Sequence, residues 1–403
     1  MAPPAAPLKT RFNKSRRPFG EPVAYPKPHP RFEPPPPANR QDLALGLEAV
    51  IPEDVPRITA AKKLVFHSLG DSGGIHGTAA EVSIAAALEK QVTEAGAPDR
   101  PAFLYHLGDV VYFNGQTNLY GYEFYEPFQF YPAPIFAIPG NHDGDTQVQP
   151  GDPVVTEPTL TGFLLNFCDS QPRHRSPYRP TMTQPYVHWT LEAPFLTVVG
   201  LYSNVDGSLD AGGTNEQQRW LQAQMAAAPK DKCLIVTVHH PPFSLDDTHG
   251  GCPEILDALD RAGSAAGRMP DLVLSGHVHD YQRFTRRVGG IATPYIIQGA
   301  GGYAHDSQSM HKLQRKTAAP IRTPFQTTRA DLILDAFNED DPGFLRLTVD
   351  RSQLVCEYFL VPFQGTPSGR PFDSVTVNWG SHTLSSSSPV RSGAARRPTR
   401  RGK

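Results

Sequence analysis

The chain has 403 residues, a formal net charge of −2, 39% apolar residues and 19% charged residues. This length and apolar content suit one large globular domain or two small ones, and the charge balance gives no electrostatic reason to expect a nucleic acid or an acidic membrane surface as the main partner. No stretch approaches the roughly 18 apolar residues of a membrane span.

The N-terminal segment is rich in proline, since 14 of the 42 prolines lie within residues 1–56. Proline lacks an N–H and has a fixed φ, so the run 34–37 cannot enter a helix or a central strand. We therefore expect residues 1–58 to form an extended, disordered arm, which could bind an SH3-like partner.

The same arm contains Ser15-Arg16-Arg17-Pro18-Phe19, which resembles a twin-arginine export signal. Such a signal needs an apolar segment next, but charged residues and prolines follow here. We expect a cytoplasmic protein, with export by this route as the alternative.

Apolar runs alternate with helical patterns from residue 63 onward. Strands are predicted at 63–69, 102–107, 134–138, 186–192, 195–201, 234–238 and 272–274, and helices at 78–95, 214–227 and 253–262. Late strands are predicted at 283–288, 294–298, 344–349 and 354–361, the last two as a hairpin. This rhythm predicts an α/β domain over residues 59–365, followed by a C-terminal extension, 366–403, that ends in a disordered basic tail.

Five of the predicted strands are followed directly by polar residues: Asp71, Asp109, Asn141, His239, and the pair His277 and His279. In open α/β sheets, ligands bind beyond the carboxyl ends of the strands, so these side chains could share one rim. Carboxylates and imidazoles gathered there would repel or stay unsatisfied without a partner. A pair of metal ions supplies that partner, and oxygen and imidazole donors without a thiolate suit Zn, Mn or Fe.

Five sequence blocks, in this order, carry a family resemblance: Gly70-Asp71-Ser72-Gly73, Gly108-Asp109-Val110-Val111-Tyr112, Gly140-Asn141-His142-Asp143, Val236-Thr237-Val238-His239 and Gly276-His277-Val278-His279. Together they resemble the calcineurin-like metallophosphoesterase superfamily. Gly73 stands where most of that superfamily carries a histidine, and Tyr112 is present as in its purple acid phosphatase branch. The resemblance implies a four-layer α-β-β-α sandwich of two mixed sheets with a dinuclear metal site at the sheet rim.

The resemblance also implies ligand roles. The first metal ion would be held by Asp71, Asp109, Tyr112 and His279. The second would be held by Asp109, Asn141, His239 and His277, with Asp109 as the bridge. The ions would be two divalent or mixed-valence metals, iron with zinc, manganese or a second iron.

Histidines near these blocks have competing interpretations. His142 is expected over the substrate phosphate, where it stabilises the transition state or protonates the leaving group; the alternative is a loop histidine satisfied by Asp143, which could instead cap a turn. His249 lies ten residues after His239, where related enzymes carry a substrate-facing histidine. His240 is expected to be structural.

The predicted activity is hydrolysis of a small-molecule phosphoric ester by in-line attack of a metal-bound hydroxide, with Asn141, His142 and His249 contacting the substrate. A phosphomonoesterase similar to acid phosphatases is the main hypothesis. A phosphodiesterase of the same superfamily is the alternative, and a catalytically silent interaction scaffold is a third. The long, proline-containing insertion at 145–185 is expected to shape substrate access.

Overall fold

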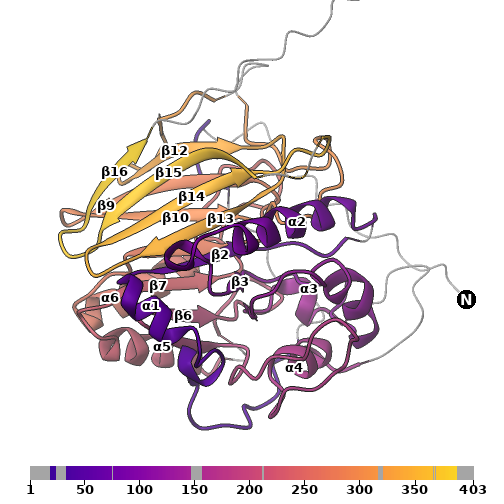
Figure 1. Ribbon diagram of the computed structural model, residues 1–403. Coiled ribbons are helices and arrows are strands. Elements are labelled where there is room, and N and C mark those ends of the chain that lie inside the picture. Colours follow the sequence, from indigo (N-terminus) through magenta and orange to yellow (C-terminus); the bar gives the residue numbers. More distant parts are fainter. Residues whose placement is uncertain are drawn as a thin grey trace, which may run out of the picture.

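The computed structural model describes residues 19–23, 33–74, 76–146, 157–210, 213–315, 321–365, 367 and 369–387. Two mixed β-sheets pack face to face, and helices cover their outer faces (Figure 1). The predicted sandwich of two mixed sheets is confirmed.

The seven-stranded sheet has the order β16-β15-β14-β13-β2-β3-β4. Its parallel part consists of β2 (Leu64–Leu69), β3 (Leu104–His106) and β4 (Ile135–Ala137). Its antiparallel part consists of β13 (Gly343–Val349), β14 (Gln353–Leu360), β15 (Arg370–Asn378) and β16 (Thr383–Ser387). The predicted hairpin is β13 and β14, and β13 also pairs with β2, which joins the two parts.

The nine-stranded sheet has the order β1-β5-β6-β7-β8-β10-β9-β12-β11. Its strands are β1 (Ala44–Gly46), β5 (Trp189–Ala193), β6 (Leu196–Leu201), β7 (Cys233–Val238), β8 (Leu272–Ser275), β9 (Tyr281–Val288), β10 (Ile291–Gln298), β11 (Phe325–Gln326) and β12 (Leu332–Asn338). The central strands β6, β7 and β8 run parallel.

Helices bury the outer face of each sheet. On the seven-stranded sheet, α2 (Ala79–Thr93) packs Ile84 and Leu88 into a cluster with residues of β2, β3 and β4. On the nine-stranded sheet, α5 (Glu216–Ala227) and α6 (Pro253–Ala266) lie side by side (Figure 1). Because side chains alternate along a strand, Ile235 of β7 enters the core between the sheets while Val236 packs under the helices.

The remaining helical segments are short. They are α1 (Val55–Ala61), α3 (Asn141–Gly144), α4 (Thr161–Phe167), and the single turns η2 (Leu47–Ala49), η3 (Ala97–Asp99), η4 (Thr117–Leu119) and η5 (Gly121–Tyr125). None of the helices in the described ranges combines the length and the apolar content that crossing a bilayer requires.

The prediction of a disordered arm over residues 1–58 is wrong for its later part. Strand β1 pairs with β5, and Leu47, Ile51 and Ile58 are buried in the core between the sheets. The prediction rested on the proline content of the whole segment. The last part of the segment also contains apolar residues that pack in the core, and the overall composition did not reveal them. Residues 1–18 and 24–32, including the twin-arginine-like stretch, lie outside the described residues.

The predicted boundary at residue 365 is also wrong. Strands β15 and β16 extend the seven-stranded sheet, with Val375 and Val377 in the core between the sheets. The alternation of these valines with polar residues is a strand pattern that the serine-rich composition masked. The basic tail after residue 387 lies outside the described residues.

Candidate metal centre

The predicted ligands come from both sheets. Asp71, Asp109 and Asn141 follow β2, β3 and β4 of the seven-stranded sheet, whereas the histidines follow β7 and β8 of the nine-stranded sheet. The strand ends of two facing sheets therefore meet at one place, which is a different arrangement from five neighbouring strands of a single sheet.

The chain is strained where it presents several of these residues. Asp71, Asp109 and His277 have φ angles of 59°, 52° and 68°. This left-handed conformation costs a residue with a Cβ about 1 kcal/mol or more. Strain of this kind gathers at functional sites, because the surrounding fold must hold it in place.

One group of donors surrounds the Tyr112 hydroxyl. The Tyr112 hydroxyl oxygen lies 3.2 Å from Asp71 Oδ1 and 3.3 Å from His279 Nε2. His279 Nε2 lies 3.5 Å from the same carboxylate oxygen. All three side chains are buried, so their oxygen and nitrogen atoms face a shared space away from bulk water.

A second group surrounds the Asn141 amide oxygen. Asn141 Oδ1 lies 3.1 Å from His239 Nε2 and 3.0 Å from His277 Nδ1. Asp109 Oδ2 lies 3.3 Å from His239 Nε2, and one ligand atom each of Asp109, His239 and His277 lies within 4.8 Å of the others. The structure thus gathers all seven predicted ligands into two adjoining groups.

The tautomer of His239 fits metal binding. Its Nδ1 lies 2.9 Å from the carbonyl oxygen of Leu107, which can only accept a hydrogen bond. Nδ1 therefore carries a proton, and Nε2 is the ring nitrogen that faces Asp109 and Asn141. Histidine ligands of metals commonly donate their second ring N–H to a carbonyl in this way.

The charges of the cluster also fit a cation. Burial and the neighbouring charge of Asp109 raise the pKa of Asp71 well above its usual value. Burial lowers the pKa of His277 and His279, the latter to about 3, so both rings stay neutral. Burial alone would also lower the pKa of His239, but the charges of Asp109 and Asp71 raise it to about 9. The two buried carboxylates thus attract positive charge, which metal ions would supply in place of a proton.

Two glycines permit this close approach. A Cβ on Gly140 would lie 2.1 Å from Asp109 Oδ1, and one on Gly276 would lie 2.5 Å from Asp71 Oδ2. Neither carboxylate could hold its position beside a larger residue. The glycines of the third and fifth sequence blocks are thus explained by the space that the carboxylates occupy.

The neighbouring residues His142 and Asp143 form hydrogen bonds with different partners. His142 Nδ1 lies 2.7 Å from the carbonyl oxygen of Phe113, and its backbone N–H donates to Asp109 Oδ1 at 2.8 Å. The Asp143 carboxylate accepts hydrogen bonds from the backbone N–H groups of Gly140 and Val110. Of the two interpretations of Asp143, the structure supports the turn cap.

The other two histidines near β7 also differ. His249 packs its ring 4.9 Å from that of His277 and 5.8 Å from that of His279, so it lies beside the cluster as expected for a substrate-facing residue. His240 is fully buried, and its Nδ1 lies 2.8 Å from Ser203 Oγ. Its contacts agree with a structural role.

Two residues near the cluster have no motif in the sequence. The ring of Tyr303 lies 4.2 Å from that of Tyr112 and 4.4 Å from that of His279. His311 stacks on His279 with ring centroids 4.3 Å apart. Tyr303 directly follows the glycine-rich segment 299–302, which resembles the same family and could have pointed to it, whereas nothing in the sequence marks His311.

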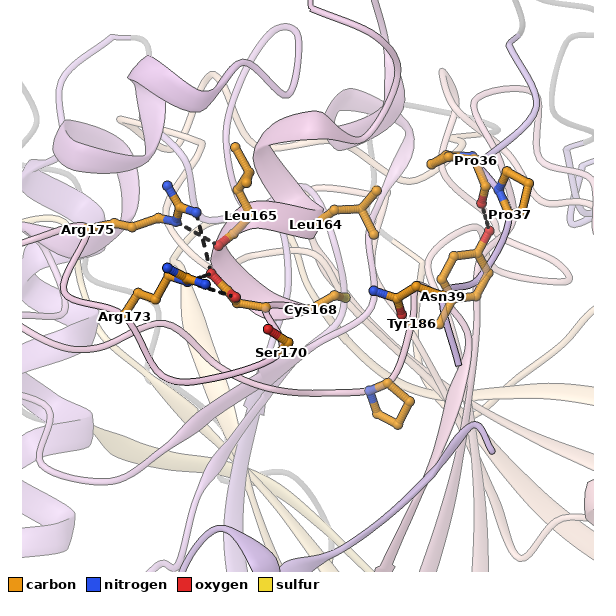
Figure 2. A pocket seen from close by; sticks show the side chains of 12 residues that line it. Pro36, Pro37, Asn39, Leu164, Leu165, Cys168, Ser170, Arg173, Arg175 and Tyr186 are labelled. Atoms are coloured by element: carbon orange, nitrogen blue, oxygen red, sulfur yellow. Dashed lines mark hydrogen bonds and ion pairs between the residues drawn. The ribbon is translucent and has the colours of Figure 1, made fainter. Parts of the chain in front are cut away.

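A separate hollow of about 360 Å³ lies between residues 36–39, helix α4 and the loop that follows it (Figure 2). Arg173 and Arg175 both form ion pairs with Asp169. Their charges are thus already engaged, and none of the predicted ligands lines this hollow. Part of the 145–185 insertion forms it, while residues 147–156 are outside the described part.

The cysteines offer no competing site. Cys168, Cys233, Cys252 and Cys356 are all free thiols and all buried.

Comparison with known proteins agrees with this geometry. The model of the family described as calcineurin-like phosphoesterase matches residues 69–281, more than half of the chain. The chain is 28% identical to the tartrate-resistant acid phosphatase type 5 of Rattus norvegicus over 66% of this chain and 81% of that protein. It is 22% identical to a probable glycerophosphodiester phosphodiesterase of Arcobacter nitrofigilis over 45% of this chain and 57% of that protein.

Solved structures show the same fold. A purple acid phosphatase from yellow lupin seeds superposes with a TM-score of 0.55 at 16% identity, covering 78% of this chain and 54% of the lupin chain. GAP50, the anchor in the inner membrane complex of Plasmodium, superposes with a TM-score of 0.51 at 14% identity, covering 77% of this chain and 88% of that one.

Proposed function

This chain belongs to the calcineurin-like phosphoesterase family, and from that premise we propose that it is a phosphomonoesterase that works with two metal ions. The observation that carries the proposal is the placement of the Tyr112 hydroxyl between Asp71 and His279. A tyrosine at this point, with Gly73 in place of a histidine, distinguishes the purple acid phosphatase type within the family.

The proposed ligand sets follow the two groups of donors. Asp71, Tyr112 and His279 would hold one ion. Asn141, His239 and His277 would hold the other, and Asp109 would bridge the two ions. A phenolate oxygen from Tyr112 favours iron in the first position, with zinc, manganese or a second iron in the other.

When bound, a pair of metal ions lowers the pKa of a water molecule and neutralises the phosphoryl oxygens during an in-line displacement. The protein's own part is to orient and to move protons. Phe113 fixes the proton on His142 Nδ1, because its carbonyl oxygen can only accept. His142 would therefore act through Nε2: when the ring carries a second proton there, that proton would go to the leaving-group oxygen, or the N–H would stabilise the phosphoryl group.

Asn141 and His249 would complete the substrate contacts. Asn141 lies at the start of α3, directly before His142, so a phosphate held by one residue lies within reach of the other. His249 approaches from the opposite sheet, beside His277. A small phosphate ester would thus be enclosed by imidazoles from both sheets.

A monoester is favoured over a diester by the names of the relatives. Three mammalian relatives that match over 62–66% of this chain are acid phosphatases. The phosphodiesterase relative from Arcobacter nitrofigilis keeps diester hydrolysis as an alternative. It is the weaker hypothesis because that relative is matched over a smaller share of this chain. The name of GAP50 describes an anchor, which keeps the scaffold as a third alternative.

The test compares hydrolysis of p-nitrophenyl phosphate and bis-p-nitrophenyl phosphate by protein reconstituted separately with Fe, Mn and Zn. The proposal predicts a clear preference for the monoester with at least one metal. A preference for the diester would identify the protein as a phosphodiesterase instead, and the proposed metal ligands would stay the same. No turnover of either ester with any metal would favour the scaffold.

A further inference from the structure

A short ribbon outside the two main sheets carries a histidine that the proposed function does not use. Residues 245–249 and 311–314, here called the His249–His311 ribbon, pair through a bridge between Asp246 and Leu313. Asp247 N–H donates to Lys312 O at 3.0 Å, and Gln314 N–H donates to Leu245 O at 2.9 Å. The ribbon therefore ties the loop of His249 to the segment of His311.

His311 is joined to the proposed ligand His279 by reciprocal hydrogen bonds. The backbone N–H of His279 donates to His311 Nδ1 at 3.0 Å, and the backbone N–H of His311 donates to His279 O at 3.1 Å. The two rings stack with centroids 4.3 Å apart and an angle of 18°. His311 thus fixes both the backbone and the ring of His279.

The same contacts settle the tautomer of His311. A backbone N–H can only donate, so His311 Nδ1 accepts the shorter contact, 3.0 Å from His279 N, and the ring proton lies on Nε2; Asp246 Oδ2 lies farther from Nδ1, at 3.4 Å. Asp246, His249 and His311 have ligand atoms within 4.8 Å of one another. Because Nδ1 of His311 is already committed to His279, this second cluster is better explained as a support than as a further metal site.

His311 also contacts the substrate-facing side. Its ring lies 4.1 Å from that of His249. The backbone N–H of His249 donates to Asp246 at 2.7 Å, which fixes the loop at the base of the ribbon. His311 therefore stands between a proposed metal ligand and a proposed substrate contact.

We propose that His311 is a positioning residue, which orients His279 toward the metal and seats His249 over the substrate position. The inference rests on the proposed function, because it needs His279 to be a ligand. It adds a residue 32 positions away in sequence, on a segment that the family motifs do not include.

The test measures Zn²⁺ binding to metal-free protein by competition with a chromophoric chelator, with no activity assay. His311→Asn keeps an acceptor near the position of Nδ1, whereas His311→Gln has similar polarity but places its amide near the position of Nε2. His305→Asn is the matched control, since His305 lies on the same segment with its side chain 44% exposed. Circular dichroism checks the fold of each variant.

Wild type should bind two Zn²⁺ per chain, and His305→Asn should match it. His311→Gln should weaken one of the two sites about 10-fold or more, because loss of a residue that orients a ligand costs 10–100-fold in affinity. His311→Asn should stay within about threefold of wild type. Equal affinity of His311→Gln and wild type would overturn the role of His311 alone, whereas a wild type that binds no Zn²⁺ would overturn the proposed function together with it.

Discussion

The two sheets contribute different chemistry to the metal centre. The seven-stranded sheet and the loops after its strands supply the oxygen donors, which are Asp71, Asp109, Tyr112 and Asn141. The nine-stranded sheet and its loops supply the nitrogen donors, which are His239, His277 and His279. In the proposed assignment, each ion would take ligands from both sheets.

The oxygen donors and the nitrogen donors hold each other in place. Asp71 accepts the backbone N–H of His277 at 2.8 Å, so an oxygen donor is fixed by the nitrogen-bearing loop. His239 in turn is fixed by the carbonyl oxygen of Leu107, which follows β3. Each group depends on the backbone of the other sheet, so the face-to-face packing of the sheets sets the geometry of the centre.

Asp109→Asn tests the residue that is proposed to bind both metal ions. Loss of the bridging charge should reduce kcat/KM by about 10⁴-fold or more, since both ions lose a ligand. The measurement is steady-state hydrolysis of p-nitrophenyl phosphate. A decrease in kcat/KM of less than about tenfold would show that Asp109 does not bind both metal ions.

His277→Ala tests the nitrogen group alone. It should remove one ligand of one ion and reduce kcat/KM by about 10³-fold, with the fold retained in circular dichroism. The matched control is His240→Ala, which removes a neighbouring buried histidine that is not a proposed ligand and should keep both metal ions in elemental analysis. Full activity in His277→Ala would contradict the ligand assignment.

His142→Ala tests a residue that contacts the oxygen group without being a ligand. We expect a decrease in kcat of about 10²-fold with unchanged metal content, because proton transfer by a positioned side chain contributes that much. The difference in kcat between wild type and His142→Ala should be smaller for a substrate with a better leaving group, because that leaving group departs without being protonated. Loss of metal from this variant would show that His142 supports the site instead.

Tyr112→Phe should have the smallest effect on rate, about tenfold, because Asp71, His279 and the bridging Asp109 would remain as ligands of the same ion. If iron occupies the position beside Tyr112, the visible charge-transfer absorption of the iron-loaded protein should disappear. Absorption spectra of wild type and variant give the comparison. A variant that keeps the colour would exclude the tyrosine as a ligand.

Much of the centre follows from the sequence because each ligand lies next to a strand end within a short motif. His239 and Asn141 are examples, since a single block places each of them. His311 could not be found in this way, because only the folded chain brings it to His279 through the ribbon with residues 245–249.

The secondary structure, too, could be predicted only in part. Long apolar runs such as β7 were predicted nearly to the residue, because both of their faces are buried. Strands β1 and β15 were missed, since they lie in segments whose proline or serine content outweighs a few alternating apolar residues. Their burial depends on the sheet edges that they join, which local composition does not report.

The central claim is that seven side chains from two sheets hold two metal ions, and anomalous X-ray diffraction from crystals of the zinc-loaded protein tests it most directly. Two anomalous peaks about 3.5–4 Å apart, with Asp109 between them, are expected. A single peak, or a peak held by Asp246, His249 and His311 with none at Asp109, would contradict it.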